Sequence, residues 1–70
     1  MIKVQFTLYD TEDRYKPVST IIQVKDGKDF RENYKAYQKR AITNICAKRY
    51  WGIDDLKRYG YTKMKYRKVD

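Results

Sequence analysis

The sequence predicts a small α+β domain with the element order β-β-α-α-β, in which a three-stranded antiparallel sheet carries one long helix packed on it and a short second helix. Three observations predict this class. Two segments near the N-terminus alternate apolar and polar side chains, a middle segment repeats apolar residues at helical spacing, and the C-terminal segment alternates again. The 70 residues are expected to form a single domain, residues 1–70, because a chain of this length builds only one small core.

The first strand is expected over residues 2–9. Apolar side chains occupy every second position from Ile2 to Leu8, and the positions between are mostly polar, which is the period of a half-buried strand. Residues 10–17 are polar and end in the single proline of the chain, so a loop is expected there.

The second strand is expected over residues 18–25, which are rich in β-branched side chains. It pairs naturally with the first strand as a hairpin. Ile21 falls on the outer face of this strand, where it is either covered by another part of the chain or exposed. The segment Asp26-Gly27-Lys28 ends the strand.

A long helix is expected to begin near residue 30 and to end between Lys48 and Trp51. Asp29 followed by Glu32 is typical of a helix N-terminus, because these side chains supply an acceptor and negative charge for the free N–H groups. Successive residues of a helix are 100° apart around its axis, so one face of this helix carries an apolar stripe. The stripe consists of Phe30, Tyr34, Tyr37, Ala41 and Ile45, and it is widened by Ile42 and Cys46.

A short second helix is expected from Ile53 to Tyr59, with Gly52 as the left-handed stop of the long helix before it. Acidic residues occupy its first turn and basic residues its last turn, which complements the helix dipole. Gly60 follows directly and predicts the end of this helix.

The segment YTKMKYRKV (residues 61–69) allows two interpretations. As a strand, which we favour, it turns Met64 and Tyr66 inward and places on one exposed face Tyr61, Lys63, Lys65 and Arg67. As a helix, residues 62–69 would be the recognition helix of a helix-turn-helix. The phrase IDDLKRYGYTKMKYRK resembles the helix-turn-helix segments of small phage and excisionase-type regulators, and this resemblance implies binding in the major groove of DNA.

The surplus positive charge lies entirely in the second half of the chain. Residues 1–32 hold six basic and six acidic residues, whereas residues 33–70 hold eleven basic and three acidic residues and account for the net charge of +8. Six of the eight tyrosines and the tryptophan also lie in residues 33–70. This segregation indicates a surface that meets polyanions, with rings available for stacking.

Basic and aromatic side chains of the second half are therefore the candidate nucleic-acid-binding residues, with the N-terminal hairpin as their scaffold. They are Lys39, Arg40, Lys48, Arg49, Trp51, Lys57, Arg58, Tyr61, Lys63, Lys65, Arg67 and Lys68. Cations that neutralise phosphates release condensed counterions, and rings stack on bases. We expect a non-enzymatic accessory or regulatory protein that binds nucleic acid, either DNA or RNA.

The alternative function is a small phage or mobile-element protein-interaction module, an adaptor or an inhibitor of a host protein. In that case the basic face docks on an acidic protein partner. An exposed edge strand would also permit a homodimer.

Several kinds of chemistry are excluded by residue type. The chain has no histidine, which removes the usual general base and the imidazole metal ligand. One cysteine cannot form a zinc site or an internal disulfide, and the apolar neighbours of Cys46 predict a buried small hydrophobe. The three glycines are far apart and form no phosphate-binding loop. We expect no enzyme activity, no cofactor and no metal.

The sequence also lacks an apolar run of the length that a membrane span needs, and its first residues lack the pattern of a secretory signal. We therefore expect a cytoplasmic protein without a membrane partner.

Overall fold

The computed structural model describes residues 1–69, apart from the side chain of Ile53. Three strands and three helices follow one another along these residues: β1 (Ile2–Asp10), β2 (Val18–Val24), α1 (Gly27–Glu32), α2 (Tyr34–Arg49), α3 (Ile53–Arg58) and β3 (Tyr61–Lys68). The strands form one antiparallel sheet in the order β2-β1-β3, so the first strand is central. The predicted α+β class is confirmed. The last segment is a strand, so the helix-turn-helix interpretation of residues 62–69 is wrong.

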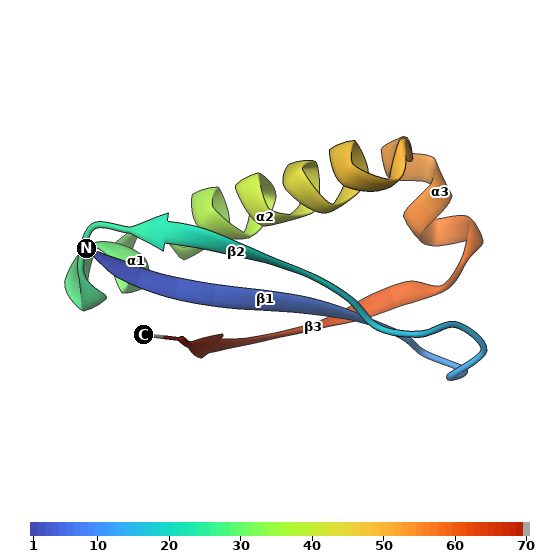
Figure 1. The fold of residues 1–70 in the computed structure, drawn as a ribbon, viewed down its shortest axis with the longest axis horizontal. Coiled ribbons are helices and arrows are strands. Elements are labelled where there is room, and N and C mark those ends of the chain that lie inside the picture. The colour runs from blue at the N-terminus through green and yellow to red at the C-terminus, as the bar shows by residue number, and fades with distance from the viewer. Residues whose placement is uncertain (70) are drawn as a thin grey trace.

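The helices leave one face of the sheet uncovered. Helix α2 runs along the strands, and α1 and α3 lie at opposite ends of it (Figure 1). In β2, every second residue from Val18 to Val24 is buried and the residues between are exposed, as expected when one face packs on helices and the other faces solvent. We call the uncovered side the open face; its outward positions are Lys3, Gln5, Thr7, Tyr9, Ser19, Ile21, Gln23, Lys63, Lys65 and Arg67.

The core between sheet and helices consists of two adjoining clusters. One gathers around Phe6 of β1, where Tyr37 and Ala41 of α2 meet the strands. The other gathers around Ile45 and includes Cys46. Burial raises the pKa of the Cys46 thiol, and its buried position confirms the sequence expectation. Burial of side chains such as Phe6 and Ile45 stabilises the fold by about 1.5–3 kcal/mol each.

The expected long helix is broken into two. Asp26, rather than Asp29, caps the first helix, since its Oδ1 accepts the Asp29 N–H at 2.7 Å. Asn33 ends α1, and its carbonyl accepts the N–H groups of Ala36 and Tyr37 in the first turn of α2. Its Nδ2 donates to Asp29 Oδ1 at 2.8 Å. The predicted stripe nevertheless faces the sheet, with these residues buried or half-buried: Phe30, Tyr34, Tyr37, Ala41, Ile42, Ile45 and Cys46.

The end of α2 also differs from the prediction. Tyr50 adopts the left-handed conformation (φ 57°) that was expected for Gly52. Gly52 is extended and begins α3, where its N–H donates to Asp55 Oδ2 at 2.8 Å. Gly60 follows α3 with a φ of 76°, as expected for a left-handed stop. None of the helices in residues 1–69 is long and apolar enough to cross a membrane.

Candidate nucleic-acid interface

The open face combines four cations with polar side chains. The cations are Lys3 on β1 and, on β3, Lys63, Lys65 and Arg67. None of its ten outward positions holds an acidic residue. Hydroxyl and amide groups fill most of the positions between, Tyr9 is the aromatic residue among them, and Ile21 is the aliphatic one. This face therefore offers positive charge and hydrogen-bond donors to a ligand.

The three cations of β3 follow one another at alternate positions along the strand. Lys63 lies beside Tyr9, Lys65 beside Thr7, and Arg67 beside Gln5, so the cations are about 6.7 Å apart along the strand. Ion pairs within residues 1–69 join Arg14 to Asp10 and Glu12, and Arg58 to Asp55. None of these ion pairs involves Lys63, Lys65 or Arg67, so the positive charge of these three residues remains available to a ligand.

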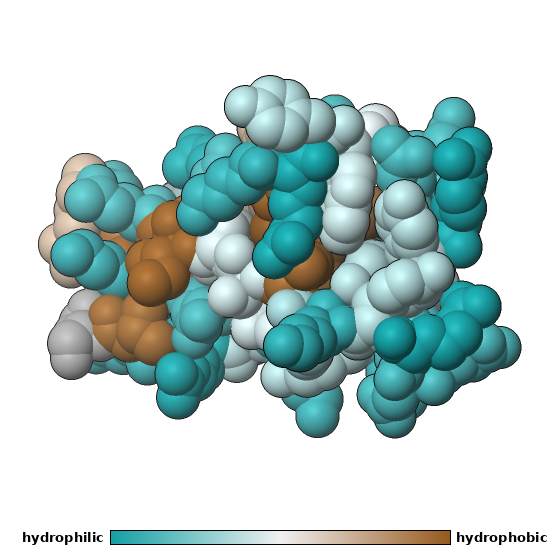
Figure 2. Space-filling model, turned by 45° about the vertical axis from the view of Figure 1, so that its right-hand side comes forward, coloured by the Kyte–Doolittle hydropathy of each residue, from teal (hydrophilic) through white to brown (hydrophobic). Residues whose placement is uncertain are grey.

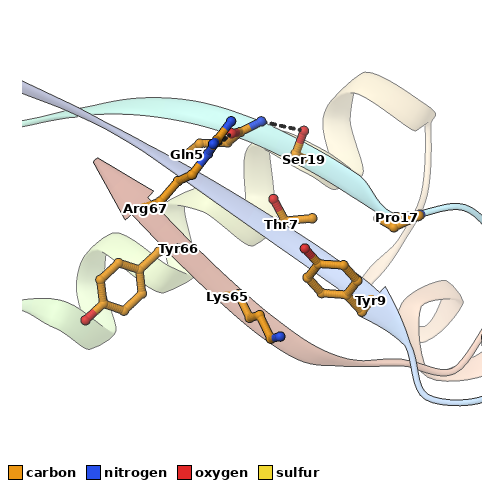
Figure 3. A pocket seen from close by; sticks show the side chains of 8 residues that line it. All are labelled: Gln5, Thr7, Tyr9, Pro17, Ser19, Lys65, Tyr66 and Arg67. Atoms are coloured by element: carbon orange, nitrogen blue, oxygen red, sulfur yellow. Dashed lines mark hydrogen bonds between the residues drawn. The ribbon is translucent and has the colours of Figure 1, made fainter. Parts of the chain in front are cut away.

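A shallow hollow of about 450 Å³ lies at the centre of the open face (Figure 3). Its lining residues are Gln5, Thr7, Tyr9, Pro17, Ser19, Lys65, Tyr66 and Arg67. The Nε group of Arg67 donates to Gln5 Oε1 at 3.1 Å, and Gln5 Nε2 donates to Ser19 Oγ at 3.3 Å. The Nζ atom of Lys65 lies 5.5 Å from the centroid of the Tyr9 ring, within the range of a cation–π contact.

Acidic residues gather at the ends of elements rather than on the open face. Carboxylates occur in the loop after β1 and in the first turns of α1 and α3. These segments lie toward the two ends of the long axis (Figure 1). Lysines and arginines lie in the same segments, so the ends are of mixed charge, whereas the ten outward positions of the open face hold basic charges without acidic ones.

Asp10, at the end of β1, is the buried member of the acidic group. Its carboxylate accepts the backbone N–H groups of Glu12, Arg14 and Tyr15 at 3.1, 2.8 and 3.2 Å. Burial alone raises the pKa of Asp10, but these hydrogen bonds and the charge of Arg14 outweigh it and hold the pKa below its usual range. Asp10 is therefore a structural carboxylate that orders the loop between β1 and β2.

No protein-family model, curated protein or solved structure matches the chain.

The candidate residues from the sequence do not form one surface. Lys63, Lys65 and Arg67 lie together on the open face. The other predicted cations lie elsewhere: Lys39, Arg40, Lys48 and Arg49 on α2, Lys57 and Arg58 on α3, and Lys68 at the end of β3. Because α2 packs on the opposite side of the sheet, its cations cannot contact a ligand together with those of the open face unless the ligand wraps around the molecule.

Tyr61 is part of the core and does not lie in the exposed row with Lys63. Pairing between β1 and β3 shifts by one residue after Tyr9, so Thr62 is an extra residue in β3 and Tyr61 turns toward the helices. Tyr61 is 7% exposed, and its hydroxyl donates to the Lys16 carbonyl at 2.8 Å. Burial raises the pKa of Tyr61. The prediction that Tyr61 lies on the exposed face with Lys63, Lys65 and Arg67 is wrong.

Trp51 lies half-buried between α2 and α3. Its ring packs against Tyr59 and Tyr61, with centroid distances of 5.3 and 5.6 Å, and Arg49 lies over it at 5.6 Å. These contacts tie Trp51 to the core cluster around Ile45.

The N-terminal hairpin contributes the open-face residues that the sequence reasoning missed. Lys3, Gln5, Thr7 and Tyr9 were recognised as the polar side of a strand, but the hairpin was expected to be only a scaffold. Alternation marks them as the outward side of a strand but does not show which strand lies beside them. Pairing β1 with β3 places both polar sides on one face.

Proposed function

We propose that this protein is a non-enzymatic nucleic-acid-binding accessory or regulatory factor and that the open face is its binding surface. One observation carries the proposal: four cations, three of them in a row on β3, lie among ten outward positions of the described sheet that include no acidic residue. A polyanion binds most strongly to a surface on which no carboxylates oppose its attraction to the cations.

The expected strength of binding follows from the number of cations. Each phosphate neutralised on duplex DNA contributes about −0.9 to the slope of log affinity against log salt. Contacts from Lys3, Lys63, Lys65 and Arg67 therefore predict a slope of about −3.5. Hydroxyl and amide groups between the cations add hydrogen bonds that position the backbone of the ligand.

Fluorescence anisotropy with a labelled 20-base-pair duplex and a 20-nucleotide single strand, between about 50 and 200 mM salt, tests the proposal. Two charge-matched triple variants locate the surface. One changes the open face: Lys63→Gln, Lys65→Gln and Arg67→Gln. The other changes α2: Lys39→Gln, Arg40→Gln and Lys48→Gln. Each variant removes two lysines and one arginine from exposed positions. The two variants therefore have the same net charge and differ in where the charges were removed.

The open-face variant is expected to bind at least about tenfold more weakly at 50 mM salt, with a slope that is less negative by about 3. The α2 variant is expected to lose only the small contribution of long-range attraction. If the α2 variant loses as much affinity as the open-face variant, the open face is not the binding surface. If the wild-type protein binds neither oligonucleotide at 50 mM salt, the proposed function is wrong.

A protein-interaction module of a phage or mobile element is the second candidate, and a separate surface favours it. An apolar hollow of about 170 Å³, between α1 and β3, is lined by Ile2, Val4, Gly27, Phe30, Tyr66 and Lys68. Apolar atoms are also visible at the end of the molecule that carries the termini (Figure 2). Beside the hollow, β3 is an edge strand of the described sheet, and such edges pair with partner strands. Failure of nucleic-acid binding would favour this region as the docking site of a protein partner.

A further inference from the structure

A hydrogen-bonded row of side chains crosses all three strands on the open face. Arg67 of β3 donates through Nε to Gln5 of β1, and Gln5 donates through Nε2 to Ser19 of β2 (Figure 3). Long exposed side chains normally sample many rotamers, and ordering them on binding costs free energy. This row reduces that cost because the Arg67 guanidinium is held before a ligand arrives.

The contact with Gln5 uses only the Nε group of Arg67. A guanidinium has five N–H donors in a planar fork, so the four N–H donors on its two Nη atoms remain for a ligand. Two such donors match the O6 and N7 acceptors of guanine, which lie together in the major groove of duplex DNA. A lysine at this position would supply charge but not this fork.

Ile21 lies directly opposite Gln5 in the pairing of β1 with β2. It is 53% exposed on the open face, so its side chain is accessible to a ligand. Apolar side chains in the major groove contact the methyl group of thymine. Gln5, Arg67 and Ile21 thus form a line of side chains across the sheet, each of a type that recognises base edges.

The composition of the open face favours a duplex over a single strand. Proteins that bind single strands stack successive bases on several rings, but the outward positions here include one ring, Tyr9, which Lys65 already covers. The cations lie on the neighbouring strands β1 and β3, and a two-stranded ribbon fits a major groove about 12 Å wide. The major groove of double-stranded RNA is too deep and narrow for such contacts.

We propose that the open face enters the major groove of duplex DNA and that Arg67, positioned by Gln5, recognises guanine there. This inference rests on the proposed function and adds a ligand class and a sequence preference to it. Lys3, Lys63 and Lys65 would supply contacts to the phosphates, which are independent of sequence.

Selection from a pool of duplexes with a randomised 12-base-pair centre, read by sequencing, tests the inference. The wild-type protein is expected to enrich a short motif that contains guanine, with a preference of about tenfold or more over the other bases at that position. Arg67→Lys keeps the charge, so its affinity for the unselected pool should stay within about threefold while the guanine preference is lost. Gln5→Ala should also reduce the preference, because it frees Arg67.

Gln38→Ala is the matched control, since it removes an amide from α2, on the other side of the sheet from the row. It should leave the preference unchanged. Binding of the duplex pool without enrichment, or a guanine preference that persists in Arg67→Lys and Gln5→Ala, would overturn the inference and leave the proposed function standing. Tighter binding of a single strand or of double-stranded RNA than of the duplex pool would also overturn it. Absence of binding to every nucleic acid would instead remove the proposed function itself.

Discussion

The Asp10 carboxylate makes the stability of this fold sensitive to acid. Its pKa is lower in the folded than in the unfolded chain, since three backbone N–H groups and Arg14 stabilise the ionised form. The unfolded chain therefore binds more protons as the pH falls. Stability that is present above the unfolded pKa is lost as the pH falls through the folded pKa.

Asp10→Asn is expected to lower the melting temperature by about 5 °C or more at pH 7, because the amide cannot reproduce a charged acceptor. The variant should also lose less stability than the wild type between pH 5 and pH 3, so that the two curves converge. Thermal unfolding followed by circular dichroism at several pH values measures this. Asp13→Asn, in the same loop but exposed, is the control, and parallel curves for Asp10→Asn and wild type would contradict the role given to Asp10.

Tyr61 is expected to serve stability and not binding. Tyr61→Phe keeps the buried ring and removes the hydrogen bond to the Lys16 carbonyl, so the free energy of unfolding should fall by about 1 kcal/mol. Its affinity for oligonucleotides should equal that of the wild type. Lys65→Gln, on the open face, should show the opposite pattern, with normal stability in urea and weaker binding. If Tyr61→Phe loses affinity for oligonucleotides while its stability is unchanged, Tyr61 contributes to binding and the role given to it here is wrong.

Among the elements, the turn from α3 into β3 is the most constrained. Gly60 adopts a φ of 76°, and a Cβ atom there would lie 2.7 Å from Asp10 Oδ1 and 3.0 Å from Arg14 Nη2. The turn thus packs against the carboxylate that orders the β1–β2 loop. The two connections at this end of the sheet depend on each other.

Gly60→Ala is therefore expected to destabilise the fold by about 2 kcal/mol, through backbone strain and the close approach to Asp10. Gly27→Ala is the matched control, because Gly27 starts α1 and a Cβ atom there would have no neighbour within 4 Å. It should be neutral or stabilising by about 0.5 kcal/mol. Chemical denaturation compares the two variants, and equal effects would contradict the assigned geometry.

The strands could be predicted from the sequence because alternation of apolar and polar residues persists through β1, β2 and most of β3.

The break between α1 and α2 at Asn33 could not be predicted. Phe30, Tyr34 and Tyr37 keep helical spacing across it, so the same apolar stripe packs on the sheet with or without the break. Alternation also failed at Tyr61, because a single extra residue, Thr62, reverses every side chain before it. Such an insertion cannot be recognised from the order of apolar and polar residues in the sequence.

The basic row of Lys63, Lys65 and Arg67 was predictable as one side of a strand. Its polar surroundings were not, because strand order cannot be derived from alternation alone. The order β2-β1-β3 joins this row to the hairpin and separates it from the cations of α2. Counting charge along the chain therefore placed in one group basic residues that the fold distributes over different sides of the molecule.

At the scale of the whole molecule, the dimensions limit what the open face can cover. The chain extends over 34 × 20 × 18 Å, and its long axis matches about ten base-pair steps of 3.4 Å. Because both ends of this axis carry acidic residues, contacts with phosphates should concentrate near its middle. The homodimer remains a prediction, and sedimentation equilibrium would test it. Like charges on Lys63, Lys65 and Arg67 disfavour pairing of two molecules through their β3 edges.

Mapping of the bound surface by nuclear magnetic resonance tests the central claim most directly. A ¹⁵N-labelled sample is titrated with a 12-base-pair duplex at low salt, and amide shift changes are assigned along the chain. We predict that the largest changes fall on the outward positions of β1 and β3, from Lys3 to Tyr9 and from Lys63 to Arg67, with small changes in α2. Changes concentrated on α2, or none at saturating duplex, would contradict the claim that the open face binds nucleic acid.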